Sequence, residues 1–162
     1  IGDDHPVTGG NWYGSYEMVE TISDSNKPII GLGEGGYAFF GELDLEIGAP
    51  WGAHFSTPSQ TGIFIYDSEA EYFDFPYQID IPNSQTLELY STLVSGVGIY
   101  LDDSEIADPP PGVTPIGTHN GSRFPIIKND PNFILWGFVG DANDLTESGK
   151  YLFLNLIHEI TF

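Results

Sequence analysis

Apolar and polar residues alternate with a period of two along much of the chain. The clearest alternation sets acids against apolar residues, in the order Glu42, Leu43, Asp44, Leu45, Glu46 and Ile47. This pattern predicts a half-buried strand with one acidic face. A second alternation over residues 73–81 predicts another strand, and Pro76 and Pro82 favour a place at the edge of a sheet. Shorter alternating runs predict strands over residues 15–21, 62–66, 86–90 and 96–101.

Two longer apolar segments near the C-terminus predict a pair of neighbouring strands. Residues 133–139 are apolar on both sides, which is typical of a central strand, and residues 151–162 are similar. The segment between them, residues 140–149, is rich in turn-forming residues and predicts at most a short turn of helix over residues 141–148. Glycine, proline or β-branched clusters interrupt most other windows, so no further helix is predicted.

These patterns predict an all-β fold, a single antiparallel β-sandwich or jelly roll domain over residues 1–162 with long loops. About eight to ten strands at spacings of roughly 8–12 residues are typical of such folds. The chain has 162 residues, of which 40% are hydrophobic, so it is long enough for a core without cysteine, which is absent. The longest expected loop covers residues 102–132 and contains three consecutive prolines from Pro109.

The net charge of the chain limits the classes of partner that it can bind. The 24 acidic residues outnumber the four basic ones and give a formal net charge of −20. Such a surface repels nucleic acids and anionic lipids, whereas it attracts hard cations such as Ca²⁺. The alternative is that the acids only solvate the surface, as in a salty habitat. No apolar run approaches the roughly 20 residues of a membrane helix, so membrane insertion is not expected. The chain starts at Ile1, and we expect an extracellular or surface protein whose leader has been removed.

One short motif suggests catalysis. Glu42, Asp44 and Glu46 form an E-x-D-x-E pattern that resembles the catalytic strand of retaining β-glucanases of the laminarinase and lichenase type. The resemblance implies that Glu42 is the nucleophile, that Asp44 tunes it, and that Glu46 is the acid/base. A retaining mechanism needs two carboxyl groups about 5–5.5 Å apart, so the side chains would have to converge across a curved sheet. The alternative interpretation is three acids on the solvent face of a strand.

Clusters of oxygen donors make Ca²⁺ a candidate cofactor. The first cluster contains Asp141, Asn143, Asp144 and Glu147, and the second contains Asp102 and Asp103 with Glu105 and Asp108. A third comprises Asn129, Asp130 and Asn132. Each offers several carboxylate or amide oxygens within a short arc, although none has EF-hand spacing. The alternative is that Asp and Asn bond to their own backbone in turns.

Aromatic residues in expected loops make a glycan a candidate ligand. Trp12 and Tyr13 lie near the start of the chain, and Trp51 and His54 follow the acidic segment. Aromatic rings stack on sugar faces, and they also cover the ends of a sandwich, so both interpretations remain open. Trp136 lies within an apolar run and is expected in the core.

Other catalytic or nucleotide-binding patterns are not recognised. The four histidines have no HExxH spacing, and no nucleophile elbow is evident. The glycine-rich segment 31–36 does not follow an expected strand and open a helix, so it predicts a turn or a close approach of two backbones instead of a nucleotide loop.

Three functional hypotheses follow. The first is a non-enzymatic structural or adhesive surface subunit that self-assembles or docks on a protein partner, with Ca²⁺ as a candidate stabiliser. The second is a lectin-like carbohydrate-binding module. The third is a small β-glucanase-like hydrolase that uses Glu42 and Glu46.

Overall fold

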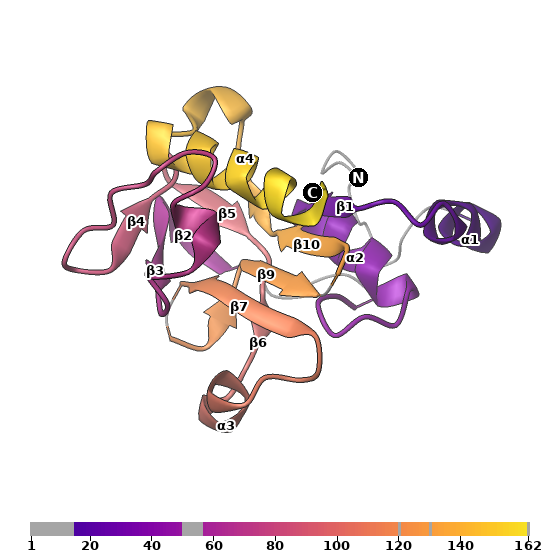
Figure 1. The fold of residues 1–162 in the computed structure, drawn as a ribbon. Coiled ribbons are helices and arrows are strands. Elements are labelled where there is room, and N and C mark those ends of the chain that lie inside the picture. Colours follow the sequence, from indigo (N-terminus) through magenta and orange to yellow (C-terminus); the bar gives the residue numbers. More distant parts are fainter. Residues whose placement is uncertain (1–14, 50–56, 120, 130, 162) are drawn as a thin grey trace.

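The computed structural model describes residues 15–49, 57–119, 121–129 and 131–161 (Figure 1). The α-helices are α1 (Tyr16–Asp24), α2 (Gly33–Glu42), α3 (Asp103–Ala107) and α4 (Glu147–Thr161), and two short 3₁₀ turns are η1 (Glu71–Phe73) and η2 (Ala142–Asp144). The strands are β1 (Ile29–Leu32), β2 (Thr57–Gln60), β3 (Gly62–Ile65), β4 (Thr86–Glu88), β5 (Val94–Gly96), β6 (Ile99–Tyr100), β7 (Val113–Thr118), β8 (Arg123–Phe124), β9 (Ile126–Asn129), β10 (Phe133–Trp136) and β11 (Phe138–Val139).

The main sheet is mixed and has six strands. Their order is β1-β10-β9-β7-β3-β4. β1 lies parallel to β10, and every other pair in this sheet is antiparallel. Two smaller sheets have the orders β11-β5-β2 and β6-β8. The parallel pair joins segments that are about a hundred residues apart in the chain, so it cannot be inferred from a local turn.

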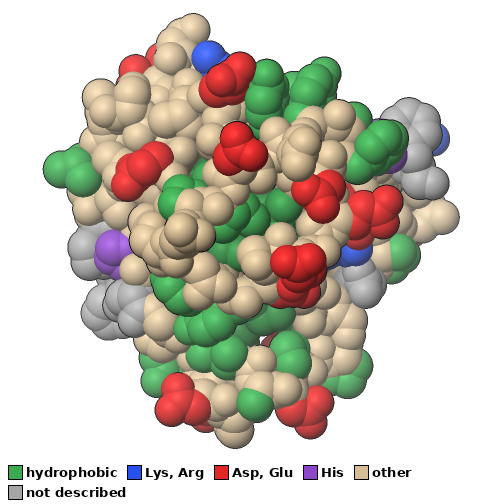
Figure 2. All heavy atoms as spheres, turned by 60° about the vertical axis from the view of Figure 1, so that its left-hand side comes forward, with side chains coloured by type: hydrophobic (Ala, Val, Ile, Leu, Met, Phe, Trp, Pro, Cys, Tyr) green, Lys and Arg blue, Asp and Glu red, His purple; other side chains and the backbone are tan. Residues whose placement is uncertain are grey.

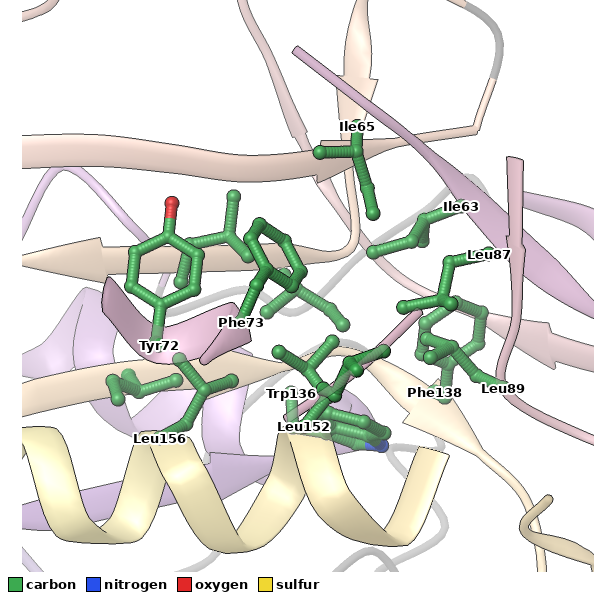
Figure 3. Close-up of a cluster of buried hydrophobic side chains, with 14 of the residues drawn as sticks. Ile63, Ile65, Tyr72, Phe73, Leu87, Leu89, Trp136, Phe138, Leu152 and Leu156 are labelled. Carbon is green, nitrogen blue, oxygen red and sulfur yellow. The ribbon is translucent and has the colours of Figure 1, made fainter. Parts of the chain in front are cut away.

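Helices cover both faces of the main sheet, and neighbouring residues of a strand face different helices. Ile126 and Ile134 belong to a buried cluster with Leu152 and Leu156 of α4. The next residues along each strand, Ile127 and Leu135, belong to a second cluster that includes α2. Figure 3 shows Leu152 and Leu156 pointing from α4 into the first cluster, beside Trp136 and Phe73. In the described part of the chain, no helix is long and apolar enough to cross a bilayer.

The fold is rich in strands arranged in mixed sheets, but the expectation of an all-β chain is wrong because α-helices form two layers. The antiparallel sandwich or jelly roll is not confirmed. Two features differ from it: β1 and β10 are parallel, and both faces of the largest sheet pack against helices.

The expected strand over residues 42–47 is wrong. Residues 33–42 form α2, and a turn follows in which Asp44 has a positive φ of 56°. The alternation arises because Ile47 is buried, while Leu43 and Leu45 are only partly buried against the same cluster. The two-residue spacing therefore reflects the side of the helix end and the following turn that packs against this cluster.

The expected strand over residues 73–81 is also wrong. The segment begins at the end of η1 and continues as irregular backbone. Of its five alternating apolar residues, Phe73 and Ile79 are buried, whereas Phe75 and Tyr77 are exposed. Proline lacks the N–H that a ladder needs, and Pro76 lies in the middle of this run.

The last expected strand, over residues 151–162, is the helix α4. Its buried residues recur at Leu152, Leu156 and Ile160, with the four-residue spacing of one helix face. Thr146 precedes the helix and its hydroxyl oxygen accepts a hydrogen bond from Gly149 N at 3.0 Å. This cap starts the helix that the apolar run alone did not reveal.

The expected loop over residues 102–132 instead contains α3, β7, β8 and β9. β7 and β9 pair in the middle of the main sheet, with a register shift between Pro115 and Gly117. The register shift accommodates a proline inside a central strand, where its missing N–H would otherwise interrupt the ladder. The strands predicted over residues 62–66 and 86–90 are confirmed as β3 and β4, and residues 133–139 are confirmed as strand in two pieces, β10 and β11.

Candidate functional site: an apolar pocket where two helices diverge

A tight turn joins β1 to α2. Leu32 is the last residue of β1, and Gly33 opens the helix with a φ of 53°. The prediction that this glycine-rich segment does not join a strand to a helix is therefore wrong. Enzymes with a nucleophile elbow use a similar sharp strand-to-helix turn to expose a reactive side chain. Here the residue with the positive φ is glycine, which has no side chain to react.

The glycines around this turn allow the strand and the helix to touch. A Cβ atom on Gly36 would lie 2.2 Å from the carbonyl carbon of Gly31, so neither backbone can carry a side chain at this contact. The predicted close approach of two backbones is confirmed. The spacing of Gly31, Gly33 and Gly36, across the end of β1 and the start of α2, also matches a dinucleotide-binding turn. However, Glu34 lies in the first turn of α2, where its charge would oppose a pyrophosphate.

The two helices that follow the parallel strands leave on opposite faces of the sheet. After β1 the chain enters α2, which packs with Leu135. After β10 it passes through β11 and η2 into α4, which packs with Ile134. When the helices that follow two neighbouring parallel strands leave on opposite faces of the sheet, a crevice opens at the carboxyl ends of the strands. This crevice is the usual ligand site of open α/β sheets.

A pocket lies at this divergence. Its lining includes the last residue of each parallel strand, Leu32 of β1 and Trp136 of β10. The remaining residues are the aromatic Tyr90, Phe138 and Phe153 and, from the segment that leads to α4, Gly140, Ala142 and Leu145. Only two of these side chains carry polar atoms, and these are bonded to each other: the indole Nε1 of Trp136 donates to Tyr90 Oη at 3.0 Å. The pocket therefore offers an apolar, aromatic surface.

The size of the pocket limits what it can hold. Its volume is about 170 Å³. An apolar cavity of about 150 Å³ holds one benzene molecule, so this pocket can take one aromatic ring or one branched aliphatic group. Phe153 packs edge-on against Trp136, with ring centroids 5.2 Å apart, and fixes one wall.

The predicted Ca²⁺ ligands of the C-terminal loop lie beside this pocket and bond to local groups. Asp141 precedes η2, and its Oδ1 accepts from Asn143 N and Nδ2, both at 2.8 Å. Asp144 Oδ2 accepts from the Thr92 hydroxyl at 3.4 Å. Glu147 accepts from the Tyr151 hydroxyl at 2.8 Å, and this hydrogen bond and the carboxylate's charge raise the pKa of Tyr151.

The second predicted Ca²⁺ cluster forms the start of α3. Asp102 Oδ1 accepts from the Ser104 hydroxyl at 2.6 Å and from Glu105 N at 3.0 Å, so the residue caps the helix. The hydrogen bonds from Ser104 and Glu105 lower the pKa of Asp102. Asp103 is the exposed first residue of α3. Among the described residues, no three His, Asp or Glu side chains are grouped so that they could hold a metal ion, and Ca²⁺ binding stays a prediction.

The three acids of the glycosidase-like motif do not share a strand face. Glu42 is the last residue of α2, whereas Asp44 and Glu46 lie in the turns that follow, and all three are exposed. The geometric premise of the resemblance is therefore wrong, and hydrolysis by these residues stays without structural support. The predicted glycan-binding residues Trp12, Tyr13, Trp51 and His54 lie outside the described residues, so glycan binding stays a prediction.

Comparison of the chain with family models, with curated proteins and with solved structures gave no significant match in any of the three. The function is therefore inferred from the pocket and its surroundings.

A second feature that sequence patterns did not indicate is the buried side chain of Gln60, at the end of β2. The residue is 8% exposed, and neither its Oε1 nor its Nε2 has a hydrogen-bond partner. A buried amide without partners costs about 1–3 kcal/mol. We expect Gln60→Met, which keeps the shape and removes both polar atoms, to raise the free energy of unfolding by about 1 kcal/mol in urea denaturation.

A matched variant is expected to change the free energy of unfolding in the opposite direction. Gln60→Glu is nearly isosteric but buries a carboxylate, so it should lower stability below that of the wild type. A loss of stability in Gln60→Met would show that the amide is bonded in solution.

Proposed function

We propose that this chain is a non-catalytic binding domain of an extracellular or surface protein, which docks on a protein partner through the pocket at the ends of β1 and β10. The observation that carries the proposal is an apolar pocket of about 170 Å³ at the place where α2 and α4 diverge. Pockets with mainly apolar walls at such positions are typical ligand sites.

The composition of the pocket supports binding without catalysis. Among the described residues that line it, Tyr90 is the one titratable residue, and its hydroxyl is bonded to Trp136. General acid–base and nucleophilic mechanisms need activated side chains within reach of the ligand. Gly33, at the adjacent strand-to-helix turn, supplies none.

The affinity for a single ring can be estimated from its area. Burial of about 150 Å² of ring surface at about 25 cal/mol per Å² contributes roughly 4 kcal/mol. This corresponds to a dissociation constant on the order of 1 mM for a small probe such as toluene. A natural partner adds contacts outside the pocket and would bind more tightly.

The test uses Trp136 as an internal reporter. In a Trp12→Phe/Trp51→Phe background, Trp136 is the only tryptophan, and it lines the pocket. We expect toluene to change its fluorescence in a saturable way. Ala142 is exposed at the rim, so Ala142→Phe should fill the pocket and weaken this binding at least about tenfold without loss of stability.

Ala107→Phe is the matched control, because Ala107 is exposed at the end of α3 and does not line the pocket. It should bind toluene like the parent protein. If toluene gives no saturable change, or if Ala142→Phe binds it unchanged, the pocket is not a binding site.

A further inference from the structure

We infer that the natural occupant of the pocket belongs to a basic, amphipathic segment of a partner protein, which inserts one apolar side chain and lies along the outward side of α4. This inference rests on the proposed function and specifies the partner. It follows from an apolar surface that continues from the pocket and from the charges around it.

The outward side of α4 carries two exposed apolar residues, which lie among the exposed polar residues Glu147, Lys150 and Thr161. Leu154 is 43% exposed and Ile157 is 37% exposed. Ile157 follows Phe153, which lines the pocket, by four residues, and it follows Leu154 by three, so Ile157 is a neighbour of both on the helix surface. The buried side of the same helix already packs Leu152 and Leu156 into the core. α4 therefore presents an exposed apolar pair outside its buried side, which favours an interaction surface there.

Aromatic residues extend this surface on the other flank of α4. Tyr77 stacks on Tyr151 with ring centroids 4.9 Å apart, and Phe75 packs edge-on against His158 at 4.8 Å. Phe75 is 52% exposed and Tyr77 is 42% exposed despite these contacts. We call Phe75, Tyr77, Leu154 and Ile157 the α4 face. Large aromatic side chains held in fixed positions are typical anchors of protein interfaces.

The charged residues near the pocket and the α4 face indicate which partner would bind there. Asp141 and Asp144 flank Ala142, which lines the pocket, and Asp74 precedes Phe75. Lys150 is the only Lys or Arg that follows Lys128; it is exposed and lies four residues before Leu154, so it is one cation beside this face against the acids named above. Lys128 is paired with Glu159 at 2.8 Å.

The acidity extends to the whole molecule. On the face shown in Figure 2, acidic side chains are scattered around hydrophobic patches. A second copy would bring another net charge of −20, so mutual repulsion disfavours self-assembly, whereas Lys and Arg on a partner would complement the rim.

The experiment compares two short amphipathic peptides that carry the same Leu and Phe residues on one side. One has Lys on its other side, and the second has Glu at those positions. We expect the Lys peptide to bind the Trp136-only protein at least about tenfold more tightly at low salt, with the difference shrinking at about 0.5 M NaCl. Leu154→Gln/Ile157→Gln should weaken binding of the Lys peptide by about tenfold and leave toluene binding unchanged.

Matched variants separate this surface from general attraction between opposite charges. Asp141→Asn/Asp144→Asn should reduce the preference for Lys, while Asp102→Asn/Asp103→Asn, with the same charge change at α3, should not. Met18→Gln/Leu93→Gln removes two other exposed apolar side chains and should bind the Lys peptide normally.

Equal losses in the target and control variants would overturn the inference and leave the proposed function intact if toluene still binds. A dimer in sedimentation that Leu154→Gln/Ile157→Gln abolishes would also overturn it, because the occupant would then be a second copy. Loss of toluene binding in the parent protein would contradict the proposed function itself.

Discussion

Replacing Gly36 by alanine is expected to lower the free energy of unfolding by about 3 kcal/mol or more. A Cβ atom there would lie 2.2 Å from the carbonyl carbon and 2.3 Å from the Cα of Gly31. Both are backbone atoms, so α2 would have to move away from β1 and out of the core cluster that holds Phe39 and Phe40. In a chain of this length such a loss lowers the melting temperature by roughly 6–12 °C, which calorimetry measures.

The direction of this change in stability tests whether β1 and α2 pack closely. Gly36 lies inside a helix, where alanine is normally more stable than glycine by about 1 kcal/mol. Without the contact to Gly31, the variant would therefore be stabilised. Glu34→Ala in the same turn is the control, and we expect it to change stability by no more than about 0.5 kcal/mol. An unchanged or higher melting temperature for Gly36→Ala would refute the close packing of β1 and α2.

Replacing Asn155 by leucine is expected to have the second-largest effect, a loss of about 3 kcal/mol. Asn155 is fully buried in α4, and its Oδ1 accepts from Tyr77 N at 3.0 Å. Its Nδ2 donates to Tyr72 O at 2.9 Å and to Tyr77 O at 2.7 Å. Leucine has a similar size but leaves all three backbone groups without this partner, at a cost of roughly 1 kcal/mol each.

The same substitution should release the segment that carries the exposed aromatic residues. These are the hydrogen bonds from α4 to the backbone of residues 72–77, so Asn155→Leu should increase amide hydrogen exchange at Tyr77 more than in the strands of the main sheet. Asn143→Leu, an exposed asparagine in η2, is the control and should leave both stability and exchange at Tyr77 nearly unchanged. If Asn155→Leu is as stable as the wild type, the segment is held by other contacts.

The parts of the fold that were predicted correctly are those where local pattern and burial agree. The run over residues 133–139 is apolar because β10 is covered on both faces, and this position leaves a signature in the sequence. β3 and β4 pair directly and were likewise recognised. In each case the immediate neighbours of the strand determine the pattern.

The helices were missed because tertiary contacts override local preference. α2 contains four glycines, which disfavour a helix, but two of them are required by the contact between Gly31 and Gly36 and by the φ of Gly33. α4 differs from the predicted strand because the exposed residues Leu154 and Ile157 are also apolar, which hides the four-residue repeat of Leu152, Leu156 and Ile160. A count of that repeat, together with Thr146 as a cap, could have identified α4 from the sequence.

The pocket could not be predicted from the sequence. It forms where β1 meets β10, and this parallel pairing joins distant segments that no short motif connects. Trp136 was correctly expected to be buried, at 3% exposure, but its position at the end of a parallel strand gives it a second role in the pocket wall. The acids of residues 141–147 were recognised as a cluster, and the structure places them beside this pocket.

The most direct test of the account is to locate a small apolar probe by NMR. Toluene added to isotope-labelled protein should give intermolecular nuclear Overhauser effects to the methyl groups of Leu32, Ala142 and Leu145, which line the pocket. It should give none to Leu101 or Val113, which are buried in the cluster on the other face of the sheet. Contacts to that second cluster, or none at the three pocket residues with toluene near saturation, would contradict the assignment of this pocket as the binding site.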